Sequence, residues 1–240
     1  MKGVLSMDRG ALKADAKDAM RQSKTSPYIT ALIYCAISYV ITVLSAKLMR
    51  IDVTVYLRLL ALNDVDAAIN YIISSRPSGF AHVIDALLRC MMLLLNAGFI
   101  IFVLKMVRRQ ENSLWNLMDG FQHFLKIIGL WILMGLYVFL WSLLFVIPGI
   151  IAAYRYRQAL YLLLDHPDMR IGECIRESKR LMRGHKAELF VLDLSFIGWA
   201  LLSSIPFVSV YTLPYMEGTY AMYYNELRRM DARREREESW

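Results

Sequence analysis

Residues 141–149 read WSLLFVIPG, and residues 199–207 read WALLSSIPF. Both stretches fit the pattern W-x-L-L-x-x-I-P, and each ends a strongly apolar run. Tryptophan favours the membrane–water interface, proline ends the helix before it, and glycine lets a chain reverse. The repeated pattern therefore predicts two membrane hairpins, with Trp141, Pro148 and Gly149 at the turn of the first and Trp199 and Pro206 at the turn of the second.

The composition of the chain is typical of a protein embedded in a membrane. Its 240 residues are 57% hydrophobic and 20% charged, with a mean hydropathy of +0.38, whereas soluble domains are about half apolar and a quarter charged. The formal net charge of +7 comes from basic residues that flank apolar runs. This distribution favours lipid headgroups over nucleic acid as the cause of the positive charge.

The hydropathy pattern predicts one polytopic all-α membrane domain with six spans and three amphipathic surface helices. The surface helices are expected at 8–24, 113–121 and 169–183, the spans at 28–49, 80–107, 124–147, 150–164, 187–204 and 207–224, and a charged cytoplasmic tail at 226–240. Each pair of spans follows a surface helix, so the chain reads as three hairpin repeats. Matching W, L, L, I and P in register favours internal repetition over chance similarity of leucine-rich spans.

The lysine and arginine distribution predicts the orientation of the spans. Basic residues cluster before the first span, between the second and third, between the fourth and fifth, and in the tail, whereas the opposite side has only Arg50, Arg58 and Arg76. Cytoplasmic loops carry the excess of lysine and arginine. We therefore expect both termini in the cytoplasm. The first 26 residues are polar, so we expect no cleavable signal peptide.

Four charged residues lie within the predicted spans, where charges are unfavourable: Arg155, Arg157, Asp193 and Glu217. At 1.5 Å per residue, Arg157 and Glu217 each lie roughly 15 Å below the outer turn, so their depths and opposite signs suit an ion pair. Arg155 points away from Arg157, and Asp193 is close to the inner boundary. A structural pair that joins two return helices is the favoured interpretation, and a polar cavity for a ligand is the alternative.

The surface helix at 169–183 has its apolar residues on one face and its basic residues elsewhere. Such helices either bind anionic headgroups or are connectors docked beneath the bundle. The candidate headgroup residues are Arg176, Lys179, Arg180, Arg183, His185 and Lys186.

Signals for catalysis are weak. The four histidines are scattered, and the sequence has no H-E-x-x-H, C-x-x-C, G-x-S-x-G or glycine-rich phosphate loop. We therefore expect no metal or other cofactor, and an enzymatic role ranks third among the possibilities.

Several motifs resemble a known family. W-S-L-L-x-x-I-P-G-I, S-K-x-L-M-x-G-H-K and L-D-L-S-F-I-G-W, with the residues around them from about 114 to 224, are similar to the bacterial integral-membrane family described as domain of unknown function 975. The chain is also broadly similar to the membrane domains of some glycerophosphodiester phosphodiesterases, but it has no soluble phosphodiesterase domain. The resemblance implies a multi-pass protein of the bacterial cytoplasmic membrane and brings no established activity.

The sequence thus favours a non-enzymatic membrane protein that interacts with lipid or supports a membrane complex. The rival is a small transporter or permease-like subunit with a polar path along spans four to six. Membrane lipids are the expected partners, other membrane proteins or a second copy of the chain are further candidates, and nucleic acid is not expected.

Overall fold

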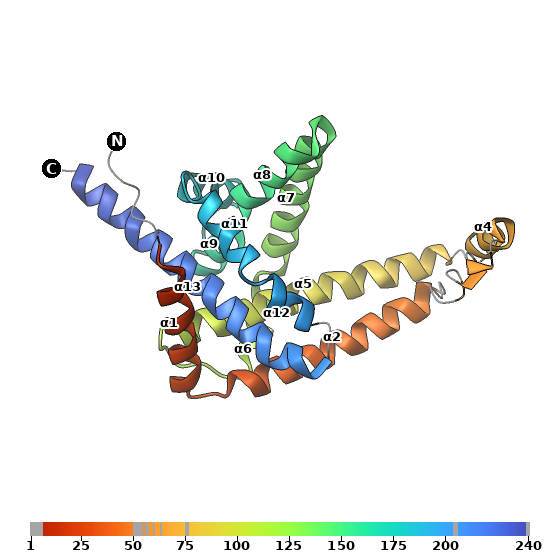
Figure 1. Ribbon diagram of the computed structural model, residues 1–240, viewed down its shortest axis with the longest axis horizontal. Helices are drawn as coiled ribbons and strands as arrows, with labels where there is room; N and C mark the ends of the chain where they lie inside the picture. Colours follow the sequence, from red (N-terminus) through yellow and green to blue (C-terminus); the bar gives the residue numbers. More distant parts are fainter. Residues whose placement is uncertain are drawn as a thin grey trace. The chain divides into compact units, whose positions relative to one another are not determined.

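The computed structural model describes residues 7–49, 55, 58–59, 61–62, 64–74, 77–203 and 206–238. Within these ranges every regular element is a helix, which confirms the expected all-helical fold (Figure 1). By their contacts the residues form two compact units, one of Met1–Ile33 with Leu94–Trp240 and one of Tyr34–Leu93. Arg50 and Arg76, which contributed to the predicted orientation, lie outside the described residues.

Three helical stretches in the described chain are long and apolar enough to cross a membrane. They are α2 (Pro27–Met49), α5 (Gly79–Val107) and the stretch Asn116–Leu144, which comprises α6 (Asn116–Asp119), the 3₁₀ turn η1 (Gly120–His123) and α7 (Phe124–Leu144). The α7 side chains of Leu125, Ile132 and Phe139 are 71%, 67% and 60% exposed. Exposed apolar surface on this scale is unfavourable in water and suits a lipid environment.

The first W-x-L-L-x-x-I-P stretch forms a tight helical hairpin. The chain leaves α7 at Phe145, whose backbone is extended (φ −161°, ψ 155°), and enters α8 (Val146–Tyr156). The reversal thus comes before Pro148, which lies in the first turn of α8, where its missing N–H removes no helical hydrogen bond. Gly149 serves close packing, because a Cβ at this position would collide with the Ser142 side chain of α7.

The second stretch has a related arrangement. Trp199 lies in α12 (Ile197–Leu202), which follows α11 (Lys186–Leu194), and its ring meets Tyr215 edge-on at 5.8 Å between centroids. Residues 204 and 205 lie outside the described residues, and α13 (Pro206–Glu238) begins at Pro206. In both stretches, proline therefore stands in the first turn of the following helix.

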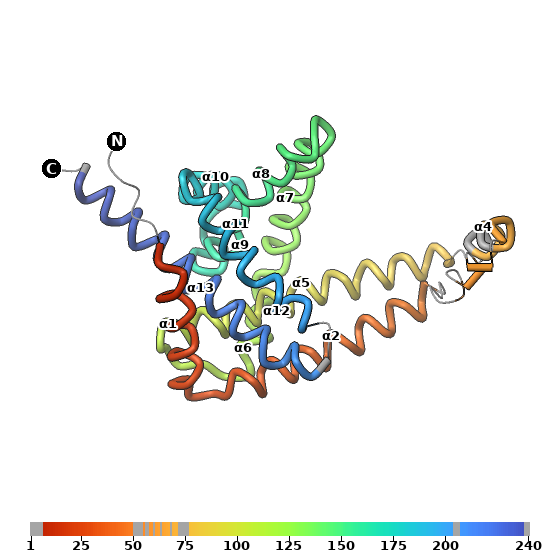
Figure 2. Tube along the Cα trace, viewed as in Figure 1, coloured from red at the N-terminus to blue at the C-terminus, as the bar shows by residue number. Residues whose placement is uncertain are grey.

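The N-terminal helix packs against the C-terminal one. Helix α1 (Arg9–Gln22) begins after Asp8, whose carboxylate accepts hydrogen bonds from the N–H groups of Gly10 and Ala11. The buried face of α1 consists of Leu12, Ala16, Ala19 and Met20, which recur at helical spacing. Helices α1 and α13 are in contact, although they come from opposite ends of the sequence (Figure 2).

The unit Tyr34–Leu93 contains most of α2, the short helix α4 (Val65–Ser74) and the first part of α5. One polar contact joins its two long helices. Asp85 of α5 is 7% exposed and accepts a hydrogen bond from the Ser45 hydroxyl of α2. Asp85 also pairs with Arg89 one turn later at 2.6 Å, so this carboxylate has partners on both sides.

Candidate functional site

The predicted fourth span is divided into two short helices. Helix α8 ends at Tyr156 and α9 (Ala159–Asp165) begins after two intervening residues. At this break, Ser178 of α10 (Ile171–Leu181) donates to the Arg155 carbonyl oxygen at 2.8 Å and accepts from the Gln158 N–H at 3.2 Å. Ser178 is fully buried. Because unpaired buried peptide groups are unfavourable, the Ser178 hydroxyl stabilises the break.

A cavity of about 450 Å³ lies beside this break. Its walls come from α5, α7, α8, α9 and α13. The lining combines apolar side chains with four polar ones, and the principal members are Ile100, Trp131, Met134, Val138, Leu160, Asn96, Arg157, Tyr161 and Glu217. Ligand sites commonly have this size and this mixture of apolar walls with a few polar groups.

The structure brings Arg157 and Glu217 to the same cavity but does not pair them. Both residues lie in the described chain, and the hydrogen bonds and ion pairs found there do not join them. Glu217 accepts a hydrogen bond from the Tyr161 hydroxyl at 3.4 Å. The Arg157 guanidinium lies 5.0 Å from the centre of the Tyr220 ring, within cation–π range. The predicted direct ion pair is therefore replaced by two separate contacts with tyrosines.

Asp193 is linked to this group through the same tyrosine. Its carboxylate accepts from the Tyr154 hydroxyl at 2.8 Å and from the Tyr220 hydroxyl at 2.7 Å. Tyr220 thus presents its ring to Arg157 and its hydroxyl to Asp193. Neither Arg155 nor Asp193 lines the cavity, but Asp193 is connected to Arg157 through Tyr220.

A second polar cluster lies where α9 ends. Arg108, just after α5, forms two hydrogen bonds with the Asp165 carboxylate, at 2.6 and 2.7 Å, and two with the Asn225 side-chain oxygen, at 3.1 and 2.8 Å. Tyr224 donates to Asp165 at 2.8 Å, and its ring stacks on Tyr161 of the cavity at 5.2 Å. Polar and aromatic contacts therefore run without interruption from the cavity to Arg108.

These contacts stabilise the charged forms of the pair. The hydrogen bonds to Asp165 raise the pKa of the Arg108 guanidinium. Burial alone would raise the pKa of Asp165, but the hydrogen bonds from Arg108 and Tyr224 outweigh this effect and hold the pKa of the carboxyl below its usual value. The pair is therefore a charged, doubly hydrogen-bonded bridge between α5 and α9.

The candidate headgroup residues on and after α10 divide into three groups. Arg176, Lys179 and Arg183 are exposed and have no ion-pair partner in the described part of the chain. Arg180 pairs with Glu177, Asp231 and Glu235 at 2.6, 2.5 and 3.3 Å, which joins α10 to α13. Lys186 is half-buried at the first residue of α11.

His185 departs from the expectation of a headgroup contact. Its side chain is only 2% exposed, and its Nδ1 lies 2.8 Å from the Glu188 carboxylate. Its backbone carbonyl oxygen accepts from the Tyr223 hydroxyl at 2.9 Å. Because the side chain is enclosed, His185 is a structural residue that holds the start of α11 against α13.

The sequence reasoning did not connect the neighbouring tyrosines with these charges: Tyr161 was not singled out, and Tyr220 was interpreted as one of several interfacial tyrosines in the sixth span, with a cofactor or cation site as the alternative. Tyr161 follows Arg157 by four positions, and Tyr220 follows Glu217 by three. Residues at these spacings are neighbours on a helix surface. A search for hydroxyl groups one turn from each charge in the predicted spans would therefore have connected both tyrosines with these charges.

These features define an all-helical protein with three helices able to cross a membrane and a cavity that carries separated opposite charges. The family described as Protein of unknown function (DUF975) matches residues 7–154 and 142–231, and the chain belongs to this family. Neither the curated proteins nor the solved structures contain a match to the chain.

Proposed function

We propose that the chain is a multi-pass protein of a bacterial cytoplasmic membrane, with six spans and both termini in the cytoplasm. Support comes from three long apolar helices, from the exposed apolar surface of α7 and from the basic clusters on one side of the predicted spans. In this topology α8–α9, α11–α12 and α13 supply the remaining three spans. The arrangement in hairpin repeats then explains why a proline stands in the first turn of both α8 and α13.

Two contacts of α1 set a requirement for this topology. The Lys13 amine of α1 donates to the Ser195 hydroxyl at 2.8 Å, and the Lys17 amine lies 5.2 Å from the centre of the Tyr215 ring. Ser195 and Tyr215 fall near the middle of the predicted fifth and sixth spans. Charged lysines are tolerated at such depth when polar groups or water reach them. The six-span arrangement therefore requires a hydrated groove between α1 and these helices.

We infer that the protein binds a membrane lipid in the cavity beside the α8–α9 break and has no catalytic role. One observation carries this inference: Arg157 and Glu217 face one cavity of about 450 Å³ and do not pair with each other. An anionic lipid group is attracted to Arg157, while the apolar walls of Trp131, Met134 and Val138 receive the chain.

Native mass spectrometry of the purified protein tests lipid binding. Arg157→Gln is expected to reduce the amount of retained lipid severalfold. Arg155→Gln is the matched control, because this arginine lies only two residues before Arg157, in α8, but does not line the cavity. Equal lipid retention in both variants and the wild type would contradict the function. A Glu217→Gln protein that fails to fold would favour the structural role of this carboxylate.

A small transporter is the second candidate, and a specific observation favours it. Helices α8–α9 and α11–α12 are both interrupted, at residues 157–158 and 195–196, and broken helices line substrate sites in many transporters. Flux of a labelled solute into proteoliposomes that is abolished by Glu217→Gln would support transport. Lipid retention without flux would support the first proposal.

A further inference from the structure

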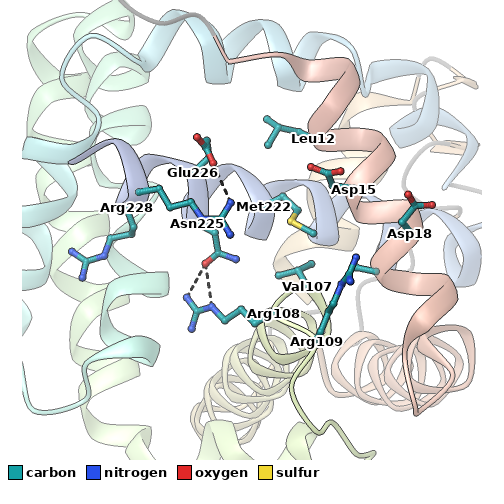
Figure 3. Close-up of a pocket in the computed structure, with 12 residues that line it drawn as sticks. Leu12, Asp15, Asp18, Val107, Arg108, Arg109, Met222, Asn225, Glu226 and Arg228 are labelled. Carbon is teal, nitrogen blue, oxygen red and sulfur yellow. Dashed lines mark hydrogen bonds and ion pairs between the residues drawn. The ribbon is translucent and has the colours of Figure 1, made fainter. Parts of the chain in front are cut away.

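A second hollow, of about 620 Å³, lies between α1, the end of α5 and α13 (Figure 3). Its floor is apolar and comprises Leu12, Ala19, Val107 and Met222. The hollow is separate from the intramembrane cavity, since the two share no lining residue. In the proposed topology, α5 ends at the cytoplasmic boundary, so the side of the hollow formed by Arg108 and Arg109 lies at the level of the lipid headgroups.

Opposite charges face each other across this hollow. Asp15 and Asp18 extend from α1, and Arg109 extends from the end of α5 (Figure 3). All three side chains are exposed, and none has an ion-pair partner among the described residues. Two carboxylates one helical turn apart repel each other. This arrangement therefore favours a cation between Asp15 and Asp18, and an anion at Arg109.

The other charged residues of the hollow already have partners. Arg108 is bound to Asp165 and Asn225, Glu226 pairs with Arg229 at 3.5 Å, and Arg228 lies 3.2 Å from His166. The charges available to a ligand are thus the two aspartates and Arg109.

The backbone at Arg109 is unusual for an arginine. Its φ is 55°, in the left-handed region, and the Gln110 N–H closes the helix end onto the Lys105 carbonyl oxygen at 2.9 Å. Helices commonly have glycine at this position, because glycine adopts this φ without strain. An arginine here keeps a guanidinium at the rim of the hollow despite the less favourable backbone conformation.

We propose that this hollow binds the headgroup of a phospholipid that carries a primary ammonium group as well as a phosphate. The ammonium group lies between Asp15 and Asp18, to which it can donate three hydrogen bonds, and the phosphate lies at Arg109. A quaternary ammonium has no N–H to donate, and an anionic lipid without an amine leaves the two aspartates unpaired. The identification of a lipid as the ligand rests on the proposed membrane location.

The test measures binding to the full-length protein by native mass spectrometry, with phospholipids of identical acyl chains and either ethanolamine, choline or glycerol headgroups. The ethanolamine lipid is expected to bind more tightly than the other two. Two variants test the charges: the double variant Asp15→Asn/Asp18→Asn and the single variant Arg109→Gly. Each should weaken binding of the ethanolamine lipid by about two- to fivefold per charge removed, as for partly exposed ion pairs. Equal binding of the three lipids, or variants that bind like the wild type, would overturn the proposal.

Arg109→Gly separates a binding role from a structural one. Glycine is the better residue at φ 55°, so this variant should unfold at the same or a higher temperature than the wild type while it loses lipid. Arg234→Gln and Glu237→Gln, which change exposed charges outside the hollow, should leave lipid binding unchanged. Loss of binding in these two controls as well would show a general charge effect and contradict a specific site.

Two further measurements define the ligand and the site. Soluble phosphoethanolamine at the same concentration should displace little of the lipid, and its binding with equal affinity would overturn the assignment to a lipid. Arg157→Gln should keep the preference for ethanolamine lipid even if the total lipid falls. If Arg157→Gln abolishes this preference, the headgroup lies in the intramembrane cavity and the assignment to the α1–α5–α13 hollow is wrong.

Discussion

Arg108 and Asp165 lie 57 residues apart in the sequence and are joined by two parallel hydrogen bonds, of 2.6 and 2.7 Å, between guanidinium and carboxylate. Their side chains are 30% and 15% exposed. Bidentate pairs of this kind are stronger and more specific in geometry than single ion pairs. This pair fixes the end of α5 to the end of α9, and through Tyr224 and Tyr161 it contacts the wall of the cavity beside the α8–α9 break.

Removal of one partner is expected to destabilise the fold. Arg108→Ala leaves the half-buried Asp165 carboxylate without its cation and should lower the free energy of unfolding by about 2 kcal/mol. Thermal unfolding in detergent measures the change. Lys24→Ala is the matched control, since the Lys24–Glu111 side chains are 76% and 90% exposed, and its effect should stay below about 1 kcal/mol.

The same pair predicts a dependence of stability on pH. The folded-state pKa of Asp165 lies below the ordinary value of 3.8 because of its hydrogen bonds from Arg108 and Tyr224. The ionised carboxylate therefore stabilises the fold fully above the unfolded pKa, and this contribution is lost as the pH falls through the folded pKa. As the pH falls from about 7 to about 3, the unfolding temperature should decrease less in Asp165→Asn than in the wild type. An identical decrease in the unfolding temperature of both proteins would refute this role for Asp165.

The break between α8 and α9 depends on one hydroxyl. Ser178→Ala removes the partner of both the Arg155 carbonyl and the Gln158 N–H in a buried environment. We expect destabilisation of about 1–3 kcal/mol, together with reduced lipid retention because Arg157 is no longer held at the cavity. Ser142→Ala serves as a control, since this exposed serine bonds only to a carbonyl of its own helix. If Ser142→Ala reduces stability and lipid retention as much as Ser178→Ala does, the proposed role of Ser178 at the α8–α9 break is wrong.

Two glycines allow α5 to approach the start of the next apolar stretch. A Cβ at Gly98 would collide with the Leu117 backbone, and one at Gly120 with the Leu94 carbonyl group. Gly98→Ala should therefore destabilise the fold by about 1–3 kcal/mol or more. Gly172→Ala on α10, where a Cβ meets nothing within 4 Å, should stabilise by up to about 1 kcal/mol. Equal melting temperatures for the two variants would contradict the conclusion that this close approach requires a glycine at position 98.

The features predictable from the sequence are those set by local pattern. The stripe of α1 and the cap at Asp8 follow from residues within one turn of each other, and the amphipathic face of α10 buries Cys174, Ile175 and Ser178. The long apolar helices follow from composition alone. In each case the residues that determine the helix, its cap or its buried face lie within or next to that helix.

The features that were missed depend on partners distant in the sequence. The break after Tyr156 requires Ser178, 20 residues beyond Gln158, and no proline or glycine marks it. The predicted Arg157–Glu217 pair rested on depth and charge sign, which cannot show that Glu217 bonds to Tyr161 and that Arg157 lies over the Tyr220 ring. His185 looked like an exposed cation near a membrane entry, but the packing of α13 encloses it.

Accessibility of single cysteines in intact cells tests the membrane topology most directly. In a variant without Cys35, Cys90 and Cys174, a membrane-impermeant thiol reagent should label Phe145→Cys, at the α7–α8 turn, in intact cells. It should label Arg9→Cys and Glu237→Cys only after the cells are permeabilised. Labelling of position 9 or 237 in intact cells, or protection of position 145 there, would contradict six spans with both termini in the cytoplasm.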